Sequence, residues 1–228
     1  MKKALTLVVL LLATSWVGAS AQVIGPVLSK SSLELGYIYK WYHRDMEPNT
    51  PVEKDWEVAS FFVRYGGTSR LTLSLEGGLW NVEHDDFPGM EFRRYTVGGG
   101  VGIRVLEVAG IGFSAFGHYN EVLDYDLSPP AFHKQTWGLN LGVLAEWSMT
   151  WKEQVLGIWG GPAYTLDESK NHAWNVRTFA YEDESATELG FVVGVNAVLW
   201  GRIVPSAHVV YADYFQGRIG IAGRWSPD

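Results

Sequence analysis

The stretch YTVGGGVGIR, residues 95–104, alternates between two kinds of side chain. One phase is apolar or aromatic and runs through Tyr95, Val97, Gly99, Val101 and Ile103. The opposite phase is small or polar and runs through Thr96, Gly98, Gly100, Gly102 and Arg104. Because successive side chains of a β-strand point to opposite faces, this period of two predicts a strand with one apolar face.

The same alternation recurs along the chain. Clear strands are predicted from the positions Leu33, Leu71, Ile111, Trp137 and Leu189, and over residues 216–225. Three further segments, residues 58–65, 155–166 and 205–213, have the composition of strands, but their alternation is blurred. The pattern therefore predicts an all-β protein with about ten strands, with eight as the alternative count.

Short and long connections alternate between these strands. Tight turns are predicted at residues 66–69, 106–110, 148–152 and 200–204. Four longer connections, which are polar and acidic, are predicted at residues 43–54, 82–91, 122–133 and 167–187. A fifth connection on the same side, at residues 214–217, is predicted to be short. Such a rhythm is typical of an antiparallel up-and-down transmembrane β-barrel, which has short turns on its periplasmic side and longer loops outside.

The first 21 residues have the pattern of a signal peptide. Lys2 and Lys3 precede a short apolar run at residues 5–13, and Ala19-Ser20-Ala21 offers the small residues of a cleavage site. Cleavage there would start the mature chain at Gln22 and change the formal net charge from −7 to −9. Residues 22–228 show no linker and are predicted to form one barrel domain.

Composition excludes several classes of protein. The acidic chain has no cluster of Lys and Arg, so nucleic acid is not an expected partner. Cysteine is absent, which excludes disulfides, thiolate metal sites and a cysteine nucleophile. After residue 21 no stretch approaches the roughly 20 apolar residues of a membrane helix, so a membrane would be crossed by strands.

The composition of the two faces indicates which one meets lipid. The polar phase is dominated by small residues, which suit the crowded interior of a narrow barrel. The apolar phase places aromatic residues near strand ends, as interfacial girdles do: Tyr39, Trp41, Tyr95, Trp137, Trp147 and Trp225. The alternative is a soluble periplasmic barrel in which these aromatic side chains fill a ligand cavity.

Residues 31–226 resemble the small bacterial outer-membrane β-barrels of the OmpA, OmpX and Opa-like group. The resemblance depends on the signal peptide, the alternating strands, the loop rhythm and a last strand that ends near Trp225. It implies the cell outer membrane of a Gram-negative-type bacterium, with lipid, lipopolysaccharide and the outer-membrane assembly machinery as partners. In that family the last strand usually ends in a terminal Phe, whereas here Ser226-Pro227-Asp228 follow Trp225.

Charged residues of both signs fall on the predicted inner face. The candidates for ion pairs in the lumen are Glu34, Lys40, Arg64, Glu76, Arg104, Glu146, Glu188, Arg218 and Arg224, with His118 and His208 beside them. Side chains largely fill a barrel of eight to ten strands, and unpaired charges there are costly, so mutual pairing is expected. The lumen is then a filled plug, or alternatively a narrow channel for small polar solutes or ions.

No catalytic, metal or cofactor site is predicted. The cluster His84-Asp85-Asp86 is similar to one half of an omptin-type protease site, but Tyr211-Ala212-Asp213 lies where an Asp-x-His motif would be needed. Neither a Gly-x-Ser-x-Gly elbow nor a compact histidine spacing occurs. The acidic loops would bind divalent cations or simply form a solvated rim. The sequence thus favours a structural or surface-interaction barrel whose loop partner it does not identify.

Overall fold

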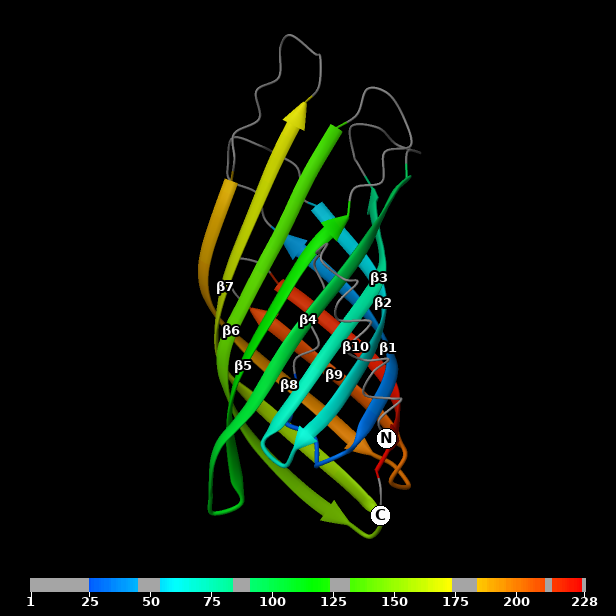
Figure 1. The fold of residues 1–228 in the computed structure, drawn as a ribbon, viewed down its shortest axis with the longest axis vertical. Helices are drawn as coiled ribbons and strands as arrows, with labels where there is room; N and C mark the ends of the chain where they lie inside the picture. The colour runs from blue at the N-terminus through cyan, green and yellow to red at the C-terminus, as the bar shows by residue number, and fades with distance from the viewer. Residues whose placement is uncertain are drawn as a thin grey trace.

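The computed structural model describes residues 25–44, 54–83, 91–123, 132–173, 184–211 and 215–226. These residues form ten strands that close into an antiparallel barrel, in which each strand pairs with its neighbours in sequence and β1 pairs with β10 (Figure 1). The strands are β1 (Leu33–Arg44), β2 (Lys54–Thr68), β3 (Leu71–Glu83), β4 (Glu91–Val108), β5 (Ile111–Leu123), β6 (Phe132–Trp151), β7 (Gln154–Ala173), β8 (Glu184–Val198), β9 (Ile203–Tyr211) and β10 (Phe215–Trp225). The prediction of ten strands is confirmed.

The tight turns gather at one end of the barrel, the lower end in Figure 1. The β4–β5 turn has two residues, Ala109 and Gly110, with φ angles of 51° and 77°. Positive φ at both positions is the requirement of a type I′ hairpin, whose twist matches that of the flanking strands. The turns predicted at 106–110 and 148–152 are shorter than expected, because β4 continues to Val108 and β6 to Trp151.

The connection predicted at residues 167–187 is wrong in extent. β7 continues to Ala173, and β8 already begins at Glu184. The sequence reads as a loop there because residues 167–172 and 182–185 are polar or charged and show no alternation of apolar and polar side chains. Figure 1 shows β6 and β7 rising beyond β1, β2 and β3 at the end opposite the tight turns.

The outer face of the barrel is apolar and exposed. Leu79, Val143, Val193 and Ile219 are all exposed there, as the predicted phase requires. Aromatic side chains are exposed on this face at both ends: Trp147, Trp151, Trp200 and Trp225 near the tight turns, and Tyr95, Tyr119, Tyr164 and Tyr211 toward the other end. The side chain of Trp137 lies outside the described residues. An apolar belt between two aromatic girdles is the outer surface of a membrane barrel.

The three blurred segments form strands with apolar side chains on both faces. Val58 and Phe62 of β2, Trp159 and Ala163 of β7, and Val204 and Val210 of β9 all point inward and are buried. Two apolar clusters result inside the barrel: one of Leu144, Trp159, Ala163, Val192 and Val210, the other of Ile38, Phe62, Val198, Val204 and Ala222. Apolar side chains therefore share the interior with the predicted polar and charged groups. No helix among the described residues is long and apolar enough to cross a membrane.

Candidate functional site

A layer of charged and polar side chains crosses the middle of the barrel. Lys40 of β1 and Glu76 of β3 form an ion pair, and neither side chain is exposed to solvent. Arg218 of β10 donates a hydrogen bond to Gln216 (Nη2–Oε1 2.5 Å), and both residues are buried. His118 of β5 is buried as well. Side chains from at least four strands thus meet at this level.

A second layer lies closer to the tight turns, at the seam where the first and last strands pair. Glu34 is directly opposite Arg224 of β10 and Arg64 of β2 in the two registers. Its carboxylate accepts hydrogen bonds from Arg224 (Nε 2.9 Å, Nη2 2.6 Å) and from Arg64 (Nη1 2.9 Å). Because β1 lies between β2 and β10, this triad joins the two ends of the barrel sheet.

A third group surrounds Glu146 of β6. Its carboxylate forms an ion pair with Arg104 of β4 and accepts a hydrogen bond from the Ser114 hydroxyl of β5. The β4–β5 register shifts between Arg104 and Leu106. Arg104 lies at the mouth of the barrel, with 28% of its side chain exposed.

The structure brings the predicted lumen candidates together with one exception. Glu34, Lys40, Arg64, Glu76, Glu146 and Arg218 are buried in the interior, and Arg104 and Arg224 are partly exposed at its mouth. Glu188 is paired with Thr165 through the β7–β8 register, but its side chain lies outside the described residues. His118 and His208 are both buried inside, as their phase predicts.

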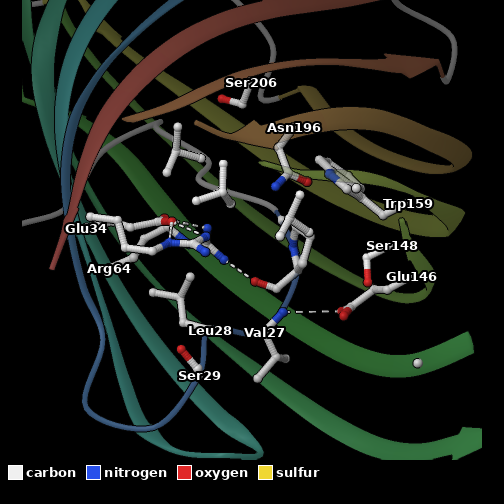
Figure 2. Close-up of a pocket in the computed structure, with 18 of the residues that line it drawn as sticks. Val27, Leu28, Ser29, Glu34, Arg64, Glu146, Ser148, Trp159, Asn196 and Ser206 are labelled. Atoms are coloured by element: carbon white, nitrogen blue, oxygen red, sulfur yellow. Dashed lines mark hydrogen bonds and ion pairs between the residues drawn. The ribbon is translucent and has the colours of Figure 1, made fainter. Parts of the chain in front are cut away.

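The segment before β1 enters the barrel, which the sequence did not predict. The backbone N–H of Val27 donates to Glu146 (Oε1 3.3 Å), and that of Leu28 donates to Thr72 (Oγ1 2.7 Å). Arg64 donates to the carbonyl oxygen of Pro26. The side chains of Val27 and Leu28 are buried, so residues 25–29 partly cover the lumen at the end with the tight turns (Figure 2). The only sequence signal is a short apolar group, Pro26-Val27-Leu28, just upstream of the first strand.

Between this segment and the barrel wall lies a cavity of about 260 Å³. Figure 2 shows Glu34 and Arg64 on one side of it, and Trp159 and Asn196 on another. Ser206 and His208 of β9 also line the cavity. The site therefore combines paired charges, neutral polar groups and the apolar cluster around Ile38 around one partly open cavity.

The described residues contain no group of three or more His, Asp or Glu that could hold a metal ion. The cluster His84-Asp85-Asp86, Asp213 and most of the acidic loop positions lie outside the described residues.

Comparison of the sequence with family models and with curated proteins gave no match. Solved structures do match the fold. An outer-membrane channel from Pseudomonas putida F1 superposes with a TM-score of 0.54 at 11% sequence identity, over 90% of this chain and 100% of that one. The β domain of the Bordetella autotransporter BrkA gives a TM-score of 0.51 at 10% identity, over 85% of this chain and 99% of that one. The fold is that of bacterial outer-membrane β-barrels, and the resemblance noted in the sequence is confirmed at this level.

Proposed function

We propose that this protein is a closed outer-membrane barrel with a structural or surface-interaction role, and that it is neither a general channel nor an enzyme. The observation that carries the proposal is the burial of the Lys40–Glu76 pair in mid-barrel, where neither side chain is exposed. A wide aqueous channel would leave charges on its wall in contact with water. Arg218 and His118, buried in the interior as well, support the same conclusion.

The exposed apolar belt and its aromatic girdles are suited to contact lipid, which agrees with a location in the outer membrane. The end with the tight turns then faces the periplasm, and the long connections face outward. We propose that these connections carry the surface interaction and that the barrel wall beside them contacts lipopolysaccharide.

Two segments of the sequence support proposals about export and assembly. We propose that residues 1–21 direct export and are cleaved before Gln22. The outward side chains Ile219, Ile221 and Trp225 of β10 are exposed on the apolar face. We propose that the assembly machinery recognises this alternation in the last strand, with Trp225 as its near-terminal aromatic residue.

Planar-bilayer recording of the purified, folded protein tests the closed barrel. Folding is verified first by heat-modifiable mobility on a gel. We expect no discrete conductance steps from the wild type. The variant Lys40→Ser/Glu76→Ser/Arg218→Ser, which removes the long side chains of the middle layer, serves as the positive control and should conduct.

Discrete steps from the wild-type protein would instead support the alternative, a narrow channel for small polar solutes or ions. Recovery of the protein in the soluble periplasmic fraction without detergent would support the soluble ligand-binding barrel. Either result would overturn the proposed function.

A further inference from the structure

Three polar atoms on one wall of the cavity have no hydrogen-bond partner within the described structure. They are the indole nitrogen Nε1 of Trp159, the amide oxygen Oδ1 of Asn196 and the ring nitrogen Nε2 of His208. Trp159 and His208 are only 3% and 6% exposed. A buried polar group without a partner costs free energy, so such a cluster indicates a missing partner in the cavity that all three residues line.

The three residues come from neighbouring strands and are held in place by close packing. Gly194 of β8 is opposite both Trp159 of β7 and His208 of β9 in the register. The Trp159 ring lies directly on Gly194, where an added Cβ would approach the ring to 2.2 Å. The centroids of the Trp159 and His208 rings are 5.2 Å apart. Asn196 lies in the same way against Gly157, where an added Cβ would be 2.6 Å from Oδ1. The wall is therefore preorganised.

The groups without hydrogen-bond partners favour a ligand that accepts hydrogen bonds over one that donates them. Besides the Trp159 N–H, the Nε–H groups of Arg64 and Arg104 have no partner in the part of the chain that the structure describes, and both arginines line the cavity. Asn196 is the one clear acceptor among these groups, because His208 Nε2 can serve either way. A ligand with several acceptor atoms matches this set better than a donor-rich one.

The charges favour an anion. The described residues around the cavity include Arg64, Arg104 and Arg224 but only two buried glutamates, Glu34 and Glu146. The third glutamate, Glu107, is at the rim with 61% of its side chain exposed and lies 3.9 Å from Arg104. Solvent screens such an exposed pair. Arg64 and Arg224 share the one carboxylate of Glu34, whereas Arg104 is paired with Glu146, so the wall around Glu34 carries one positive charge in excess.

The remaining wall is apolar. The cluster of Ile38, Phe62, Val198, Val204 and Ala222 lines the same cavity. Water alone could hydrogen-bond to the polar wall, but it gains no free energy from contact with this apolar surface. A ligand with a hydrocarbon body does gain free energy there, because it buries apolar surface. The cavity volume of about 260 Å³ is the space of about eight or nine water molecules at roughly 30 Å³ each, enough for a molecule with a similar number of non-hydrogen atoms.

We infer that the cavity at the end with the tight turns binds a small amphipathic carboxylate. Its carboxylate accepts a hydrogen bond from Trp159 in the field of the three arginines, and its hydrocarbon body packs on the apolar cluster. This inference goes beyond the proposed surface role and is independent of whether the barrel conducts.

Isothermal titration calorimetry of the folded full-length protein with hexanoate tests the inference, and hexan-1-ol of the same chain length separates charge from hydrophobicity. We expect saturable binding of one hexanoate per protein and at least roughly tenfold weaker binding of hexan-1-ol, which lacks the charge-assisted hydrogen bonds. Absence of saturable hexanoate binding would mean that the cavity holds water only and would overturn the inference. Equal binding of the two ligands would overturn the carboxylate assignment.

Substitutions in the cavity wall test whether the ligand binds in this cavity. Trp159→Phe keeps the aromatic ring but removes the N–H, and it should weaken hexanoate binding roughly tenfold. Trp225→Phe is the matched control, since Trp225 is exposed on the outer face and should leave binding unchanged. Val198→Thr keeps the shape of the apolar wall but makes it polar, and it should weaken binding several-fold, which provides a second test if Trp159→Phe does not fold. Equal affinities of the wild type and both cavity variants would exclude this cavity as the site.

Discussion

Separating the buried pair Lys40–Glu76 should destabilise the barrel more than removing the pair altogether. Both side chains are fully buried, so a single substitution leaves the other charge inside the barrel without its partner. Breaking a buried pair in this way costs about 3–5 kcal/mol, whereas replacing both partners with apolar residues of similar size is often close to neutral. We therefore expect Lys40→Met and Glu76→Met each to lose about 3–5 kcal/mol, and the double variant to lose far less than their sum.

The measurement is the free energy of unfolding in urea, followed by tryptophan fluorescence on protein folded in detergent micelles. With a slope of about 2 kcal/mol per molar urea, a loss of about 4 kcal/mol moves the midpoint by about 2 M. Lys30→Met and Glu153→Met are matched controls, because both residues are exposed near the tight turns and should change stability by less than about 0.5 kcal/mol.

Additive losses in the double variant would show that the two side chains do not depend on each other. Single losses below about 1 kcal/mol would show that water reaches the middle layer. The second result would also contradict the closed lumen on which the proposed function depends.

Three further predictions concern packing, lipid contact and export. Gly161→Ala should destabilise the barrel by about 1–3 kcal/mol in the same urea assay, because an added Cβ would lie 1.9 Å from the carbonyl oxygen of Val143, whereas Gly77→Ala, with its nearest atom at 3.7 Å, should be close to neutral. Equal losses at the two glycines would contradict the packing of β6 on β7. Ile219→Arg places a charge on the lipid face and should cost about 2–4 kcal/mol in lipid vesicles, against little change for Ile219→Leu, and tolerance of the arginine would argue against the membrane orientation. Intact-mass analysis of protein extracted from the outer membrane should show a chain that begins at Gln22, and a retained leader would refute the predicted cleavage.

The strands and their facing could be read from the sequence because both depend on local order. Residues 95–104 alternate with a period of two, and in a strand successive side chains point to opposite faces. This alone predicts Thr96 inside and Tyr95 outside, where the structure places them. The same local rule failed in residues 58–65, 155–166 and 205–213. In those strands apolar side chains such as Phe62 and Trp159 are needed on the inner face, so neither phase stands out.

The sequence by itself predicted a barrel of about ten strands, the inward-facing side chains of its clearly alternating strands, and an inner face with charges of both signs. Tertiary structure decided which of these side chains meet. Glu34 and Arg224 are 190 positions apart and become neighbours only when the last strand closes on the first. The insertion of Val27 and Leu28 into the lumen and the convergence of Trp159, Asn196 and His208 on one cavity likewise have no local pattern. Alternation is a property of neighbouring residues, whereas register, closure and cavity shape arise from contacts between strands distant in the sequence.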